Sequence, residues 1–192
     1  HVTDRRQRQM CIRDRALPAI REQRSVYLVE GYMDVIGLWR AGVRHCVATF
    51  GTAITHEHVQ RLVRLVAGLR VVLVFDGDSA GRAAAAKSFS VFLNSGIDVY
   101  VLFLKEGEDP DSLAAAHAES TAQYLEQQSL EQLFTSFLRW TVAKYGADSA
   151  RALGAAARGK LAREIAALLS KVSNPVERSL LLEESGTLLG VN

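Results

Sequence analysis

The sequence predicts an α/β protein, in which a four-stranded parallel sheet flanked by helices is followed by a small all-α helical bundle. Two observations support this fold class. Between residues 26 and 104, short Val-rich apolar runs alternate with segments of helical period, the pattern of βαβ units whose parallel sheet is buried on both faces. From about residue 119 onward the chain is rich in Ala, Leu, Glu and Gln and has no strand-like run, so only helices are expected there.

The composition is that of a folded chain. Of the 192 residues, 48% are hydrophobic and three are proline, which predicts a soluble, cytoplasmic protein. No apolar run approaches the roughly 20 residues that cross a bilayer, and no signal-peptide pattern opens the chain. The net charge of +2 predicts no strong affinity for nucleic acid by itself, because non-specific binding requires clustered Lys and Arg. Cys11 and Cys46 are too few and too far apart for a zinc ribbon or a disulfide framework.

The first fifteen residues are expected to lie outside the fold. They read HVTDRRQRQMCIRDR, hold five arginines and show neither a strand period nor a helix period. A disordered or foreign tail is favoured over a functional basic arm. Because the chain has no initiator methionine, we expect a fragment whose native sequence begins near Ala16.

The strands are predicted at four apolar runs, which read VYLVE, CVATF, VVLVFD and IDVYVLFL in chain order. The segments between them have helical period and predict three crossover helices: YMDVIGLWRAG, THEHVQRLVRLVAG and SAGRAAAAKSFSVFLNSG. Gly42, Gly68 and Gly96 stand near the ends of these segments, as C-cap glycines do.

A change of composition follows the last strand. The segment KEGEDPDSL leads into a final helix of the α/β unit, and breaks at Gly146, Gly154 and Pro175 divide the helical sequence beyond it. We therefore expect three parts: a tail over residues 1–15, an α/β domain over residues 16–128 and a helical subdomain over residues 129–192.

Three of the four predicted strands end in acidic residues: Glu30 after the first, Asp76 and Asp78 after the third, and Asp109 and Asp111 after the fourth. Each has a structural explanation by itself, as a strand-end acid in water, as an Asp-Gly-Asp turn with a helix cap, or as a helix start with proline at its first position. Together they are expected at one edge of the sheet, where ligands of parallel sheets bind.

Acids gathered at one edge repel one another, and a divalent cation removes that penalty. Carboxylate oxygens without nearby His or Cys favour Mg²⁺ or Mn²⁺ over zinc. Such ions neutralise phosphate oxygens and activate an attacking hydroxyl, so the sequence predicts phosphoryl-transfer chemistry.

Four segments closely resemble the Toprim domain, a metal-binding fold of bacterial primases, topoisomerases and some nucleases: VEGYMDVIGLWRAGV, ATFGTAIT, VFDGDSAGRAAA and LKEGEDPDSL. The forms EGYMDVI, DGDSAGRAA and GEDPD look specifically like the bacterial replicative DNA primases of DnaG type. The tail SNPVERSLLLEESGTLLGV is similar to the helical subdomain that closes their polymerase core. The resemblance implies a Toprim fold and a nucleotidyltransferase of the primosome. Such an enzyme makes short RNA primers from ribonucleoside triphosphates on single-stranded DNA during replication.

The resemblance also implies roles for individual acids, with one to three Mg²⁺ or Mn²⁺ ions and no zinc in this fragment. Glu30 would be a metal ligand that serves in acid–base or metal chemistry. Asp76 would bridge metals, and Asp78 would hold the metal bound to the incoming triphosphate. Auxiliary ligands, or residues that support the ligands, would be Asp34, Asp109 and Asp111.

Glycines and one arginine of the same motifs are expected at the nucleotide. Gly31, Gly77 and Gly81 would keep side chains out of the phosphate path. Arg82 either faces a phosphate or pairs with Asp78 one helical turn away, and the sequence does not favour one of these over the other.

The resemblance implies that a zinc-binding domain, the basic amino-terminal half of the polymerase core and a carboxy-terminal helicase-binding domain are missing. The fragment should therefore bind metal and nucleotide better than it primes, and reach the replicative helicase only through that missing domain. The alternative is a fragment of a Toprim topoisomerase or nuclease, which would use the same acids on a cleaved phosphodiester. A metal-free scaffold is a third hypothesis.

Several other residues are given structural interpretations. The HEH segment at residues 56–58 is expected to be a solvated helix start, because residues two apart on a helix point to different faces. Basic residues of the α/β part are expected on ordinary solvated surface: Arg61, Arg64, Arg70, Lys87 and Lys105. Aromatic residues at helical spacing are expected in the core, not in base-stacking platforms: Trp39, Phe89, Phe92, Phe134, Phe137 and Trp140.

Overall fold

The computed structural model describes residues 15–49, 53–105, 107–128 and 130–190 of the chain. Most of the predicted tail therefore lies outside the described residues. Residues 15–23 form a helix, which the sequence analysis does not anticipate, and Ala16 and Ile20 on this helix are fully buried. No helix in these ranges is both long enough and apolar enough to span a membrane.

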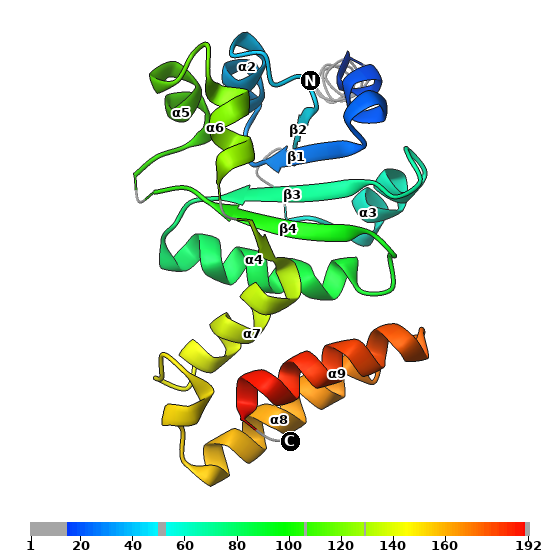
Figure 1. Ribbon diagram of the computed structural model, residues 1–192, viewed down its shortest axis with the longest axis vertical. Coiled ribbons are helices and arrows are strands. Elements are labelled where there is room, and N and C mark those ends of the chain that lie inside the picture. Colours follow the sequence, from blue (N-terminus) through cyan, green and yellow to red (C-terminus); the bar gives the residue numbers. More distant parts are fainter. Residues whose placement is uncertain (1–14, 50–52, 106, 129, 191–192) are drawn as a thin grey trace, which may run out of the picture.

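A mixed, mostly parallel sheet forms the centre of the molecule (Figure 1). Its strand order is β2-β1-β3-β4-β5. The first four strands confirm the prediction and are parallel: β1 (Ser25–Val29), β2 (Cys46–Ala48), β3 (Arg70–Phe75) and β4 (Asp98–Phe103).

A fifth strand, β5 (Glu131–Gln132), pairs antiparallel with β4. The expectation that no strand follows residue 119 is therefore wrong. Glu and Gln have little strand propensity, so this two-residue strand exists only because its backbone satisfies the open edge of β4.

Helices cover both faces of the sheet (Figure 1). On one face lie α2 (Tyr32–Arg40), α5 (Pro110–Ala116) and α6 (Thr121–Gln127), and on the other lie α3 (His56–Val63) and α4 (Ser79–Phe92). Side chains alternate along each strand, so β1 sends Val26 and Leu28 into one core and Tyr27 and Val29 into the other. Two apolar faces explain why the strands read as continuous hydrophobic runs.

The three crossover helices start within one residue of the predicted positions but end before the predicted glycines, at Arg40, Val63 and Phe92. Gly42, Gly68 and Gly96 have positive φ values of 86°, 66° and 65°, the left-handed conformation in which glycine commonly ends a helix. At the start of α3, the backbone N–H of His58 donates to Oγ1 of Thr55, and Nδ1 of His58 accepts from the backbone N–H of Thr55. The HEH segment is thus a capped helix start, as expected.

The helical region consists of α7 (Leu133–Ala143), a 3-10 turn (Ala150–Ala152), α8 (Ala155–Leu169) and α9 (Pro175–Leu189). Figure 1 shows α7 leading from the sheet layer to the α8–α9 pair. The rings of Phe134 and Phe137 on α7 each lie 5.0 Å from the ring of Phe89 on α4. Because α7 packs on α4, the helices share a core with the sheet, and the boundary near residue 129 stays a prediction.

One side chain ties the α8–α9 loop to the α4–β4 loop. The amide of Asn94 donates to the carbonyl oxygen of Lys171 at 2.9 Å, and Oδ1 accepts from the N–H and the hydroxyl of Ser173 at 2.7 and 3.0 Å. Asn94 itself has a φ of 64°, a conformation that Asn tolerates better than most residues.

Asn94→Gly keeps the left-handed backbone and removes these bonds, so we expect the free energy of unfolding to fall by about 1 kcal/mol. Asn94→Ala also strains the backbone and should lose about 1 kcal/mol more. Urea unfolding of both variants measures the two contributions separately. Equal stability of Asn94→Gly and the unmodified chain would contradict a stabilising role for the three bonds.

Candidate metal centre

The parallel register brings the predicted acids to one edge of the sheet. Leu28 pairs with Leu73, so the residue after β1, Glu30, stands level with Phe75 and beside Asp76. The β4 strand continues the same edge, because the N–H of Leu104 donates to the carbonyl oxygen of Phe75 at 2.9 Å. We call this region the acidic edge and define it by the residues Glu30, Asp34, Asp76 and Asp78.

The acids at this edge act on one another electrostatically. The pKa of Glu30 is raised by burial first, and then by the negative charges of Asp76, Asp34 and Asp78. Burial also raises the pKa of Asp34, although a hydrogen bond from the N–H of Gly31 opposes this, and the charges of Asp109, Asp111 and Asp76 raise it further. Glu30 is therefore within electrostatic reach of Asp34, Asp76 and Asp78, and Asp34 is within reach of Asp76, Asp109 and Asp111.

The Asp76–Gly77–Asp78 turn is a joint between β3 and α4, as expected. Oδ1 of Asp78 accepts the N–H of Gly81 at 2.7 Å and caps α4. This cap uses one carboxylate oxygen and so fixes the orientation of the other. Asp76 is exposed at the end of the strand, and Gly77 is half-buried between the two acids.

The structure gives Gly81 a task different from the predicted one. Gly81 is buried, and a Cβ at this position would collide with the backbone carbonyl of Asp76. The missing side chain therefore lets the first turn of α4 approach the end of β3 and hold Asp76 in place. A clear phosphate path at Gly31, Gly77 and Gly81 stays a prediction.

Two of the auxiliary acids have structural roles in the folded chain. Oδ2 of Asp34 accepts the N–H of Gly31 at 2.8 Å at the start of α2. Oδ1 of Asp109 accepts the N–H of Ser112 at 2.7 Å and caps α5, and this bond lowers the pKa of Asp109. These contacts do not test the prediction that the two acids are auxiliary metal ligands.

The sequence analysis missed two residues near the acids. A Cβ at Gly37 in α2 would lie 2.9 Å from Cα of Asp111, so Gly37 allows α2 and α5 to approach closely. The sequence signal for Gly37 is a glycine inside a predicted helix. Glycine destabilises a helix interior, so its presence there suggests a packing requirement. One residue before Asp109, Oε2 of Glu108 is buried with no hydrogen-bond partner; nothing in the GEDPD pattern distinguished this acid from its neighbours.

Arg82 does not form the predicted pair with Asp78 among the ion pairs of the described residues. Its guanidinium instead lies 4.7 Å from the ring centroid of Phe103, at the carboxyl end of β4. A guanidinium stacked on a ring keeps its N–H groups free to donate in the plane of the group. The phosphate-facing alternative stays a prediction.

The donor chemistry of the acidic edge fits a hard divalent cation. Its predicted ligands are carboxylate oxygens, the charges of neighbouring acids raise the pKa of Glu30 and Asp34, and the described ion pairs include none of these acids. Within the described ranges, no three His, Cys, Asp or Glu side chains are close enough together to hold one ion. Carboxylate oxygens are ligands that Mg²⁺ prefers, together with water and substrate phosphates, and a metal site at this edge stays a prediction.

Glu30→Gln tests the repulsion at this edge without metal. Folding raises the pKa of Glu30, so the associated stability is fully present below its ordinary pKa of 4.5 and is lost as the pH rises through the raised value. In chelator at pH 7 we expect Glu30→Gln to be more stable than the unmodified chain by less than about 1 kcal/mol, because solvent screens the charge. At pH 3.5 the variant and the unmodified chain should be equally stable.

Thermal unfolding at low salt measures this difference in stability, with Glu119→Gln at an exposed position as the control. A Glu30→Gln variant that is less stable than the unmodified chain at pH 7 would contradict the prediction.

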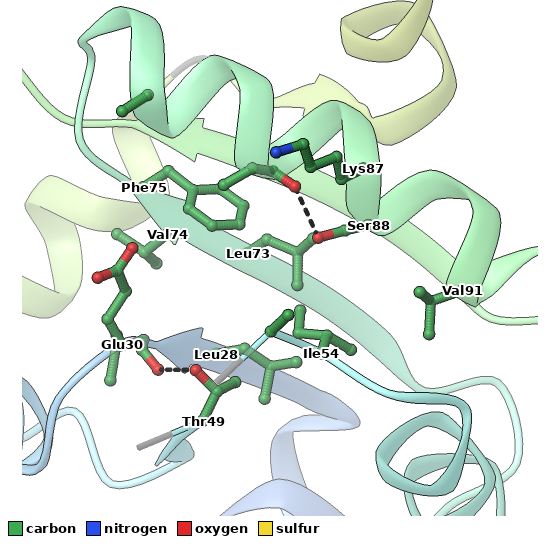
Figure 2. Close-up of a pocket in the computed structure, with 14 residues that line it drawn as sticks. Leu28, Glu30, Thr49, Ile54, Leu73, Val74, Phe75, Lys87, Ser88 and Val91 are labelled. Carbon is green, nitrogen blue, oxygen red and sulfur yellow. Dashed lines mark hydrogen bonds between the residues drawn. The ribbon is translucent and has the colours of Figure 1, made fainter. Parts of the chain in front are cut away.

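A cavity of about 520 Å³ lies beside Glu30, between β1, β3 and α4 (Figure 2). Oγ of Ser88 donates to the carbonyl oxygen of Ala84 at 2.9 Å, and Oγ1 of Thr49 donates to that of Val29 at 3.4 Å. The walls are otherwise largely aliphatic, and the charged lining groups are those of Glu30 and Lys87. The size is that of cavities that hold small ligands.

The comparisons with known proteins agree with this geometry. Residues 27–114 match the family model described as Toprim-like, and residues 138–192 match the DnaB-helicase binding domain of primase. The DNA primase of Pseudomonas aeruginosa is 38% identical over 175 residues, which are 90% of this chain and 25% of that protein. The second family match corrects the expectation that a helicase-binding segment is missing from the fragment.

Solved primase structures have the same fold. A DNA primase domain from Pseudomonas aeruginosa matches with a TM-score of 0.73 and 37% identity, over 88% of this chain and 51% of that one. A DnaG primase catalytic domain bound to single-stranded DNA matches with a TM-score of 0.72 and 32% identity, over 87% and 51%. The predicted fold class is confirmed. The chain belongs to the DnaG-type family of bacterial DNA primases, and it corresponds to about half of the solved catalytic domains of that family.

Proposed function

We propose that this chain provides the metal-dependent half of a primase catalytic core, which joins ribonucleotides into a short RNA primer on single-stranded DNA. One observation supports this above all others: the charges of neighbouring acids raise the pKa of both Glu30 and Asp34, Asp76 contributes to both, and none of these acids is in a described ion pair. Polymerases that transfer nucleotides use carboxylate edges of this kind.

Mg²⁺ or Mn²⁺ bound at this edge would supply positive charge for the phosphate oxygens and lower the pKa of the attacking hydroxyl. Asp76 and Asp78 would be its principal ligands, with Asp78 oriented by the cap of α4. Glu30 would take up the proton of the attacking hydroxyl, since its raised pKa makes it a better proton acceptor than an ordinary carboxylate. Arg82, stacked on Phe103, would donate to the triphosphate.

The proposed partners follow from the relatives. Single-stranded DNA is the proposed template, because one matching structure is a DnaG catalytic domain bound to it. The replicative helicase is a proposed partner of residues 138–192, because they match a model described as helicase-binding. Ribonucleoside triphosphates are the proposed substrates.

A chimera tests the function directly. Residues 25–190 replace the matching segment of the Pseudomonas aeruginosa primase, which supplies the remainder of the enzyme. We expect primer synthesis on single-stranded DNA that requires ribonucleoside triphosphates and Mg²⁺ or Mn²⁺. A folded chimera that cuts or relaxes plasmid DNA and makes no primers would instead support the topoisomerase or nuclease alternative. Absence of both activities, together with no Mn²⁺ binding by calorimetry, would support the scaffold.

A further inference from the structure

The helical region contains a cluster of positively charged residues that has no role in the proposed metal site. Residues 139–171 include seven Lys or Arg and two Asp or Glu, whereas the whole chain has 23 and 21. A basic segment attracts polyanions locally even when the net charge of the whole chain is close to zero.

Two aromatic rings near the junction of α7 and α8 each have a lysine beside them. Nζ of Lys144 lies 4.8 Å from the ring centroid of Trp140, and Nζ of Lys160 lies 5.9 Å from that of Tyr145. The hydroxyl of Tyr145 donates to Glu164 at 2.8 Å, which fixes this ring against α8. We call this the α7–α8 surface and define it by Trp140, Lys144, Tyr145, Lys160 and Arg163.

The α7–α8 surface is accessible to a ligand. Lys144, Lys160 and Arg163 are exposed, and both rings are half-buried. Trp140 belongs to neither hydrophobic core of the described residues, so the prediction that it is a core residue is wrong. A half-exposed ring beside a lysine offers a stacking face for a base and a charge for its phosphate at once.

We propose that the α7–α8 surface binds single-stranded nucleic acid, at a site separate from the acidic edge. This inference rests on the proposed function in one respect: the bound single-stranded nucleic acid would be the template. In Figure 1 the C-terminal end of α7 and the start of α8 lie on the same side of the view as the carboxyl ends of β1 and β3.

A protein partner is the competing occupant, because residues 138–192 match a helicase-binding model. An acidic protein surface would use the lysines and Arg163, but it would have no need of two rings, each with a lysine beside it. Base stacking uses both features, and we therefore favour nucleic acid.

The test measures the anisotropy of a fluorescent oligo-dT with the whole chain in chelator, so that metal binding has no influence. In Lys144→Gln/Lys160→Gln we expect at least fivefold weaker binding. The slope of log K against log salt should also be shallower by about 1.4, as for two lost phosphate contacts on a single strand. The control is Arg61→Gln/Arg64→Gln, at the end of α3 and directly after it. It removes the same formal charge from two exposed positions, one of them paired with Glu57, and should bind as the unmodified chain does.

The ring is tested separately. Tyr145→Ala should weaken oligo-dT binding about fivefold or more at a salt concentration that screens the lysines, whereas Tyr145→Phe, which keeps the ring, should not. Thermal unfolding confirms that each variant is folded. Because oligo-dT binding is measured in chelator, without metal, a failure of the metal-site proposal is distinguishable from a failure of this one.

Two outcomes would overturn the proposal. Oligo-dT binding by the double lysine variant that equals that of the unmodified chain would remove nucleic acid as the ligand. If this variant instead loses binding to a DnaB-type helicase and keeps oligo-dT binding, the α7–α8 surface is a protein interface.

Discussion

Replacing Asp76 by asparagine is expected to lower primer synthesis by the chimeric primase by about two to three orders of magnitude, the loss that follows removal of one stabilising electrostatic group from an active site. Asp76 stands at the end of β3, where its charge raises the pKa values of both Glu30 and Asp34. Asp76 is therefore the acid whose charge acts on both carboxyl groups. We expect its replacement by a neutral residue to lower the affinity for a divalent ion more than replacement of any other acid at this edge. Calorimetry on the chain alone should show the heat of Mn²⁺ binding disappear.

The matched control is Asp98→Asn, which makes the same change of charge at the opposite, amino-terminal end of β4. It should leave Mn²⁺ binding and primer synthesis at the level of the unmodified chain. Primer synthesis that survives in Asp76→Asn would remove this residue from the metal site, and an equal loss in Asp98→Asn would show that net charge alone matters.

Gly81→Ala is expected to destabilise the fold by about 1–3 kcal/mol, the range for a side chain forced into a packed site. Its Cβ would meet the backbone of Asp76, with the carbonyl carbon 3.1 Å away, and backbone cannot move aside as a flexible side chain can. Either α4 or the end of β3 must shift, so Mn²⁺ affinity should fall together with stability. Urea unfolding and calorimetry on the same preparation measure both effects.

Gly159→Ala is the control for this substitution. It is also a glycine within a helix, but the nearest atom to its Cβ would be the guanidinium of Arg163 at 3.8 Å, an ordinary contact. Alanine should stabilise α8 here by about 0.5–1 kcal/mol, because glycine disfavours helix interiors. If Gly81→Ala also stabilises the chain, the close approach of α4 to Asp76 is not a constraint on the fold.

The sequence predicted the α/β architecture because its information is local and repeated. Apolar runs such as VVLVF read as strands buried on both faces, and the glycines that follow the crossover helices have positive φ values, as glycines in turns commonly do. By contrast, β5 has no strand signal in Glu131 and Gln132 and arises from pairing with β4. A pairing between residues about thirty apart has no signature in a short window of sequence.

The sequence predicted which acids belong to the acidic edge, but it did not predict how neighbouring backbone segments pack around them. Its acids follow strand ends, and parallel strands end at a common edge, so their convergence follows from topology. The steric roles of Gly81 and Gly37 depend on which backbone lies opposite each one, Asp76 in one case and Asp111 in the other. Similarly, helical spacing placed Trp140 in the core, whereas Trp140 belongs to neither core although Val142, two residues later on α7, belongs to one.

The sequence by itself determined the fold class, the family resemblance and the set of acids, because periodicity and motif spacing are properties of the chain. Only the tertiary structure decided which acids influence one another's pKa, that Arg82 stacks on Phe103, and that the lysines of α7 and α8 share a surface with two rings. Each of these depends on distances between residues remote in sequence, which are fixed only when the sheet and the helices pack.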